Sequence, residues 1–275
     1  MCHQCVIDSV RQRMLTRRGF FGAAAASAAG AAALVAAGPA AAQTAAGGQG
    51  GAVDLTHTYD AEFPTFFGQP QISMKQLFNY AEHKFNLFEL TVNEHTGTHI
   101  DAPLHFSADG HSVDEIAVST LVAPLCVIDI RARAAENPDA QVTPDDIKAW
   151  IAAHGPIPRR ACVAMNSGWA QHVRTPRFRN ADDKGVMHFP GFHVEAAQML
   201  IEDGNAASIA VDTLSLDHGP SQDFATHYAW LPTNRYGIEN LAGLDELPPA
   251  GATIVVGAPK HRGGSGGPAR IFALL

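Results

Sequence analysis

The chain has 275 residues, 46% of them hydrophobic, so it can bury a full core, and one large domain is favoured over two. Its formal net charge is −8 at pH 7, and no basic patch or run of basic and aromatic residues follows residue 42. This charge disfavours binding to nucleic acid and to anionic membrane surfaces. We therefore expect neither among its partners.

The first 42 residues have the pattern of an export signal. Arg17 and Arg18 stand in Thr-Arg-Arg-Gly-Phe-Phe, and an uncharged, alanine-rich run extends from there to Ala42. The small-residue end at Ala40–Ala42 favours cleavage, and the paired arginines favour the twin-arginine route to the periplasm. A membrane-spanning helix is the alternative, but alanine and glycine transfer weakly into lipid, so we expect no stable anchor after processing. The expected divisions are a signal over 1–42, a flexible linker over 43–51 and one domain over 52–275.

The domain carries strand and helix signals in mixture. Leu87–Asn93 alternates and contains Leu, Phe and Val, which predicts a strand. Thr143 is a good N-cap and Pro144 suits a first helical position, so a helix is expected to about Ala153. A second helix is expected from about Val194 to Glu202, ending at Gly204. Short apolar runs predict buried strands at Leu125–Ile130, Ala161–Met165, Ser208–Val211, Thr253–Val256 and Ile271–Leu275.

Two cysteines and one glycine-rich tract are further candidates for chemistry. Cys126 and Cys162 lie in apolar strand-like segments, so buried free thiols are expected, with a disulfide as the alternative in an oxidising compartment. The glycine-rich tract 263–267 lacks the lysine and the strand-then-helix setting of a phosphate loop. We expect this tract to be a loop with tight turns.

The segment from His95 to His105 carries the chemistry: His-Thr-Gly-Thr-His-Ile-Asp-Ala-Pro-Leu-His. Imidazole and carboxylate together suit zinc, manganese or iron. Gly97 permits a turn that brings His95 and His99 to one point, with Asp101 following. The alternative is a histidine-rich surface loop or a set of structural histidines. So many polar groups in this order, directly after an apolar strand, favour a shared function.

The pattern His-x-Gly-Thr-His-x-Asp-x-Pro-x-His resembles the signature of the cyclase-like metal hydrolases, a family that includes bacterial kynurenine formamidase and isatin hydrolase. The likeness extends over nearly all of the domain. Further matching segments are 53–57, Phe189-Pro190-Gly191, 211–217, His227, 238–241 and 264–270. The resemblance implies a mixed α+β fold, a single domain with a layered β/β/α arrangement, and a homodimer or higher homo-oligomer.

The resemblance also implies roles at the site. The implied metal ligands are His95, His99 and Asp101, and the residues that complete the site are His105, His227 and Glu239. His105 is expected to transfer protons or to help hold a second metal. His227 and Glu239 are expected to act as a base or as further ligands. A divalent metal lowers the pKa of bound water to about 7, and a histidine can carry the proton to the leaving nitrogen. Zinc is expected first and manganese second, as one ion or two.

The implied activity is hydrolysis of the C–N bond of a small, aromatic amide. An arylformamidase acting on N-formylkynurenine is placed first, and cleavage of a cyclic amide such as isatin is the alternative. Export argues against N-formylkynurenine as the substrate, because it separates the enzyme from cytoplasmic tryptophan breakdown. A non-catalytic exported metal- or ligand-binding protein is the other class. His105, His227 and Glu239 argue against that class, since binding alone requires no proton transfer.

Other polar and aromatic residues have plainer alternatives. Asp212 and Asp217 can orient a histidine ligand, although capping of turns is preferred. Trp169 with Phe63, Phe66 and Phe67 lines an aromatic pocket or belongs to the core. His188 and His193 touch the substrate or begin a helix, and His218 is placed in a loop near the pocket. The remaining histidines are assigned to the surface or to structure: His57, His83, His111, His154, His172 and His261.

Overall fold

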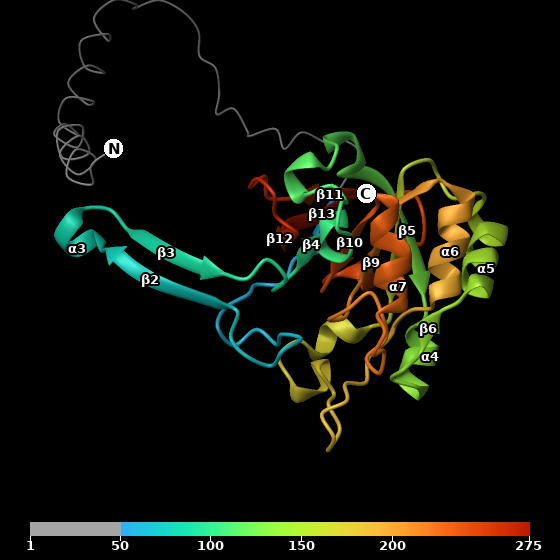
Figure 1. Cartoon of the computed structure of the whole chain (residues 1–275), viewed down its shortest axis with the longest axis horizontal. Helices are drawn as coiled ribbons and strands as arrows, with labels where there is room; N and C mark the ends of the chain where they lie inside the picture. Colours follow the sequence, from blue (N-terminus) through green and yellow to red (C-terminus); the bar gives the residue numbers. More distant parts are fainter. Residues whose placement is uncertain (1–50) are drawn as a thin grey trace, which may run out of the picture. The chain divides into compact units, whose positions relative to one another are not determined.

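The computed structural model describes residues 51–275, so the expected export signal and all but the last residue of the expected linker lie outside the described residues. Within residues 51–275, no helix is long and apolar enough to cross a membrane. The mixed sheet with helices confirms the predicted α+β class (Figure 1).

Nine strands form the main mixed sheet. They are β1 (Ala52–Asp54), β4 (His99–Asp101), β5 (Val122–Asp129), β7 (Ala161–Asn166), β9 (Ala206–Val211), β10 (Tyr236–Glu239), β11 (Thr253–Gly257), β12 (Gly266–Pro268) and β13 (Arg270–Leu274). Their order is β1-β13-β11-β5-β7-β9-β10-β4-β12. The four central strands β5, β7, β9 and β10 are parallel, whereas the strands outside them pair antiparallel. The five strands predicted as buried are all present; β5, β7 and β9 are mostly buried, whereas β11 and β13 are fully buried on one face only.

Two helices cover one face of the parallel strands (Figure 1). Helix α5 (Pro144–His154) begins at Thr143, whose backbone and hydroxyl both bond to Asp146, and ends at Gly155. Helix α6 (Val194–Asp203) ends at Gly204 in the left-handed conformation. Both predictions are confirmed to within one residue. Shorter helices are α4 (Arg131–Glu136) and α7 (Ala225–Trp230).

Single-turn 3-10 helices and a second small sheet complete the described chain. The 3-10 helices are Pro103–Phe106, Val113–Glu115, Val118–Thr120, Trp169–His172, Pro176–Phe178, Leu231–Thr233 and Leu244–Glu246. The small sheet pairs β6 (Gln141–Val142) with β8 (Gly191–Phe192) in parallel. This pairing ties the segment before α5 to the segment before α6.

Alternation along the central strands divides the core between the two faces of the sheet. In β5, Cys126 and Ile128 face the helices, and Leu125 and Val127 pack in the apolar cluster on the other face. Cys162 of β7 belongs to that second cluster, so the two cysteines lie on opposite faces. Both are free and buried, as the apolar segments predicted.

Residues 75–89 are grouped apart from residues 51–74 and 90–275, which belong to one compact unit. Strands β2 (Ile72–Phe78) and β3 (Leu87–Val92) pair in a two-stranded sheet, and α3 (Tyr80–His83) lies between them in sequence. The strand predicted from Leu87 is present, but all six of its residues are exposed. Alternation of apolar residues therefore identified the strand without identifying a buried face.

The glycine-rich tract is only partly a loop. Gly266–Pro268 forms β12 and pairs antiparallel with β4, so the loop prediction is wrong for Gly266 and Gly267. A Cβ atom on Gly266 would collide with the carbonyl oxygen of Ile100. The missing side chain lets the backbone approach β4 closely, which glycine alone allows.

Candidate metal centre and its cavity

The site is built on β4 and its neighbour β10. His99 and Asp101 are two residues apart on β4, so their side chains lie on one face while Ile100 packs in the core behind them. Glu239 of β10 pairs directly opposite His99 in the antiparallel register. Local strand geometry therefore directs three polar side chains to one point.

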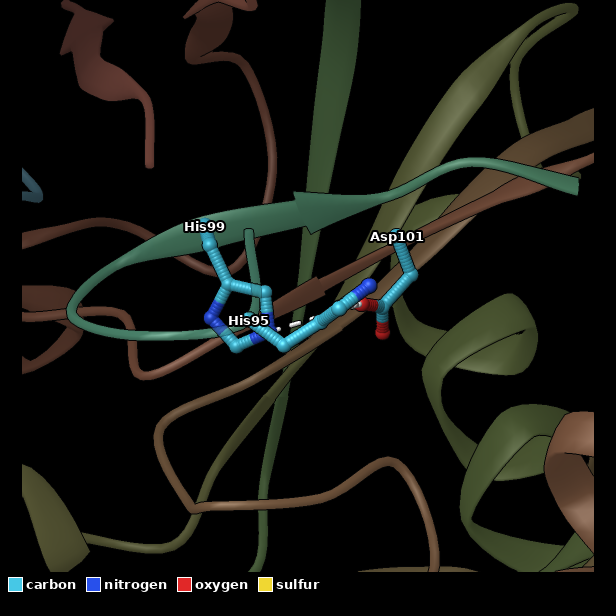
Figure 2. A group of neighbouring side chains, drawn as sticks. All are labelled: His95, His99 and Asp101. Atoms are coloured by element: carbon cyan, nitrogen blue, oxygen red, sulfur yellow. Dashed lines mark hydrogen bonds and ion pairs between the residues drawn. The ribbon is translucent and has the colours of Figure 1, made fainter. Parts of the chain in front are cut away.

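His95 reaches the same point through a turn. Gly97 has a φ of 64°, the left-handed conformation that favours glycine. His95 Nδ1 lies 2.7 Å from Asp101 Oδ1, and His99 Nε2 lies 3.4 Å from the same oxygen (Figure 2). Ligand atoms of His95, His99 and Asp101 all lie within 4.8 Å of one another. The structure thus brings together the three residues that the sequence proposed as ligands.

A second group shares Asp101. Ligand atoms of Asp101, His227 and Glu239 also lie within 4.8 Å of one another. His227 Nε2 is 3.2 Å from Glu239 Oε1, and His99 Nε2 is 3.3 Å from Glu239 Oε2. His227 comes from α7, far along the chain from the motif, and the fold places it beside the carboxylates of Asp101 and Glu239.

Unpaired atoms in this cluster fit a divalent metal ion. His99 Nε2 and Asp101 Oδ2 are buried and have no hydrogen-bond partner among residues 51–275. Buried polar atoms are normally satisfied, so these two point to an unassigned partner. Imidazole nitrogen and carboxylate oxygen are ligands that zinc and manganese both accept.

Asp217 and Asp212 have different roles in the structure. Asp217 Oδ2 lies 2.6 Å from His227 Nδ1, which fixes the ring so that Nε2 faces the cluster. Asp212 instead accepts hydrogen bonds from Ser167 and Trp169 backbone N–H groups and from the Ser167 hydroxyl. Asp217 thus orients a site histidine, whereas Asp212 caps a turn.

Opposite charges shift the pKa values inside the cluster. Burial alone would lower the pKa of His99, but the nearby carboxylates of Asp101 and Glu239, at 3.4 Å and 3.3 Å, outweigh it and raise the pKa to about 10. Burial acts to raise the pKa of Asp101, yet its three histidine contacts hold that pKa well below the usual range. A metal must displace protons from such a cluster, so its affinity falls as the pH falls.

His105 differs from the other site histidines. Its ring stacks on that of His95 with 3.7 Å between centroids, and neither ligand group found within residues 51–275 includes it. Burial lowers the pKa of His105 to about 4; the charges of His95 and His227 add to this shift, and that of Asp101 opposes it. The imidazole is therefore neutral at pH 7 and able to accept a proton.

The cluster lies at a cavity of about 370 Å³, a volume suited to a small aromatic molecule. His95, His99, His105, His227 and Glu239 all contribute to its lining. The aromatic lining residues are Phe63, Phe66, Phe67, Phe106 and Phe224. The pocket predicted for Phe63, Phe66 and Phe67 is therefore present, and Phe106 and Phe224 join it without having been predicted. Phe106 follows His105 in sequence, and that adjacency was the available signal.

Trp169 belongs to the core and not to this cavity. Its indole N–H donates to the Phe178 carbonyl oxygen at 2.9 Å, and its ring is buried. His188 bonds to Asp139, and His193 caps α6, so each has a structural partner. Neither of these histidines lines the cavity, nor does His218.

Gly266 ties the backbone of β12 to the site. A Cβ atom there would lie 2.8 Å from His95 Cε1 and would also collide with the Ile100 carbonyl oxygen. We expect Gly266→Ala to destabilise the fold by about 1–3 kcal/mol and to weaken metal binding by displacing His95. Denaturant unfolding and metal titration measure both effects. Gly51→Ala is the control, because a Cβ at Gly51 meets only Leu275 Cδ1 at 3.9 Å. An unchanged unfolding midpoint in Gly266→Ala contradicts the packing argument.

Comparisons with known proteins show which family the chain resembles in sequence and fold. Residues 53–218 match the family model described as "Putative cyclase". The chain is 34% identical over 195 residues to isatin hydrolase of Roseibium aggregatum, covering 68% of this chain and 73% of that protein. It is 28% identical over 194 residues to kynurenine formamidase of Salinibacter ruber, covering 70% of this chain and 81% of that protein. The structure of isatin hydrolase A from Ralstonia solanacearum superposes with a TM-score of 0.77 and 38% identity, over 82% of this chain and 92% of that chain.

Proposed function

The chain belongs to the cyclase family of hydrolases, and we propose that it hydrolyses the C–N bond of a neutral, cyclic aromatic amide such as isatin. The observation that carries this proposal is the His95, His99 and Asp101 cluster at an aromatic cavity. The same relatives support an N-formyl aryl amine as the second candidate.

The geometry indicates which residues would hold the metal ion and which would orient them. His95, His99 and Asp101 would hold a divalent ion, zinc or manganese, with Glu239 available to a second one. Such an ion supplies a Lewis acid and a water of lowered pKa at neutral pH. Asp217 keeps His227 Nε2 turned toward the carboxylates through its 2.6 Å contact with Nδ1. The charges that would hold the ion are therefore oriented before substrate arrives.

His105 is the proposed proton carrier. Its neutral ring lines the cavity, and no side-chain hydrogen bond occupies it within the described residues. Hydrolysis adds one water across the amide: oxygen bonds to the carbonyl carbon, the C–N bond breaks, and the nitrogen gains a proton. His105 can take the proton from the attacking water and return it to the leaving nitrogen. A cyclic amide opened in this way gives one product that carries both an aryl amine and a carboxylate, and the carboxyl proton is released to solvent.

The charge of the cavity distinguishes the two candidate substrates. N-formylkynurenine carries an ammonium and a carboxylate on its amino-acid end, whereas isatin is neutral. Among residues 51–275, those that line the cavity include no lysine or arginine, and their only carboxylate is Glu239 of the metal cluster. Placing an unpaired charge in such a cavity is costly. We therefore place the cyclic amide first, reversing the order that the resemblance alone suggested.

Parallel assays of isatin and N-formylkynurenine test this proposal. The full chain, reloaded with zinc or manganese, is expected to open isatin with the higher kcat/KM, and a chelator should abolish the activity. Higher kcat/KM for N-formylkynurenine would reverse the order of the substrates. Firmly bound metal with no turnover of either compound would support a non-catalytic binding protein instead.

We also propose that the protein is exported to the periplasm by the twin-arginine route. The support is the pair Arg17–Arg18 ahead of an uncharged, alanine-rich run. Replacing both arginines with lysine should leave the protein in the cytoplasm on cell fractionation. Unchanged export would contradict the proposed route.

A homodimer is proposed on the basis of exposed apolar side chains on the β2–β3 hairpin. Those side chains are Met74, Tyr80, Leu87, Phe88, Leu90 and Val92. Apolar groups gathered on one element commonly mark an interface. Light scattering on the purified chain measures the mass directly, and a monomer at micromolar concentration would contradict this proposal.

A further inference from the structure

A hydrogen-bonded chain leads from His95 away from the metal cluster. His95 Nε2 lies 2.9 Å from Ser265 Oγ, and the Ser265 hydroxyl donates to Glu94 Oε2 at 2.6 Å. Glu94 Oε1 lies 2.6 Å from His261 Nε2. These contacts join two segments about 170 residues apart in sequence. His261, expected from sequence to be a surface or structural residue, is the outermost member.

The direction of each hydrogen bond follows from the chemistry of the groups. An ionised carboxylate only accepts, so the Ser265 hydroxyl must give its proton to Glu94. The serine oxygen is then free to accept, and His95 must donate through Nε2–H. A neutral ring with its proton on Nε2 has its lone pair on Nδ1. Nδ1 is the atom that lies 2.7 Å from Asp101.

Without this chain, the other tautomer would be favoured. At 2.7 Å, the Asp101 carboxylate is a good acceptor for an N–H group on His95 Nδ1. A proton on Nδ1 would remove the lone pair that a metal requires. The Ser265–Glu94 contact opposes this outcome because, in the neutral ring, it requires the single proton on the opposite nitrogen.

The glycine tract makes room for these side chains. A Cβ atom on Gly264 would collide with His261 Nε2 and would also press on the Glu94 carboxylate. Ser265 therefore stands beside a glycine whose missing side chain admits the two outer members. The glycine-rich tract 263–267 therefore has a packing role: it makes room for His261 and Glu94.

We propose that Ser265 and Glu94 are positioning residues that hold His95 in the tautomer and orientation that bind the metal, with His261 holding Glu94. This proposal rests on the metal site proposed above. A carboxylate that orients a histidine ligand also makes it more basic, and loss of such a partner typically costs about 10–100-fold in metal affinity.

Zinc affinity of the full chain, measured by competition with a chelator, tests the proposal. Ser265→Ala and Glu94→Gln are each expected to weaken zinc binding about 10–100-fold, and Ser265→Thr, which restores the hydroxyl, to recover most of it. Ser119→Ala and Glu202→Gln are matched controls, because both residues are exposed. Their affinity should equal that of the wild type.

Proton NMR of the zinc-loaded protein gives a second readout that a merely structural role would not change. The His95 Nε2–H proton should be visible downfield and protected from exchange in the wild type, and lost in Ser265→Ala. If Ser265→Ala does not fold, zinc affinity and the His95 proton signal are measured in Glu94→Gln instead. Wild-type affinity together with a protected His95 proton in the folded variant would overturn the proposal. Wild-type protein that binds no zinc, or His95→Ala that binds it normally, would instead refute the metal site.

Discussion

The His99→Ala variant is expected to retain no metal after gel filtration. His99 Nε2 lies between the carboxylates of Asp101 and Glu239, at 3.4 Å and 3.3 Å, and its side chain is buried. Its removal deletes a ligand and the imidazole that lies between these two carboxylates, which keep only His95 and His227 as histidine neighbours. We expect a larger loss than the roughly 10–100-fold that follows removal of an outer partner.

Elemental analysis of the purified variant measures this loss, and circular dichroism shows whether the variant has folded. His154→Ala is a suitable control, since His154 is exposed at the end of α5. A folded His99→Ala protein with a full complement of metal would show that the assignment of the site is wrong.

His105→Ala should have the opposite profile, with metal retained and turnover lost. His105 stacks on His95 but belongs to neither ligand group of the described residues, so its removal leaves both groups complete. General acid–base catalysis contributes about 10²–10⁴-fold, and we expect kcat to fall within that range. Steady-state kinetics with measured metal content check the prediction. Loss of metal in parallel with activity would instead make His105 a ligand.

The shifted pKa of His105 also gives the sign of a pH effect. Its folded pKa of about 4 lies below the ordinary value of 6.5, so protons bind the unfolded chain more readily. Above pH 6.5 the ring is neutral in both the folded and the unfolded chain, so it does not affect the free energy of unfolding. Between pH 6.5 and about 4 the unfolded chain binds the proton first, and the free energy of unfolding falls progressively. His105→Ala should accordingly weaken the acid dependence of unfolding in this interval.

Elements whose boundaries depend on residues close together in sequence were predicted correctly. Helix α5 begins at Thr143 because the threonine and Asp146 satisfy the first turn, and these residues stand close together in sequence. The motif from His95 to Asp101 was likewise predictable, because a turn at Gly97 and strand alternation bring its side chains to one face. Spacing predicted the turn and a candidate metal cluster, whereas the ligand set came from family resemblance and strand β4 was not predicted.

Contacts between distant segments were not predictable in the same way. His227 and Glu239 entered the site through family resemblance, since nothing in their own segments indicates that β10 and α7 meet β4. Strand β12 escaped prediction because glycine has no side-chain pattern to indicate pairing. The contact of Ser265 with Glu94 depends on the same unforeseen pairing.

Metal titration of isatin hydrolysis tests the central claim most directly. The full chain is first stripped with a chelator, and initial rates are then followed as zinc or manganese is added. We predict no activity in the stripped protein and a rise that saturates at one or two ions per chain, absent in His99→Ala. Undiminished isatin hydrolysis by the stripped protein would contradict the account.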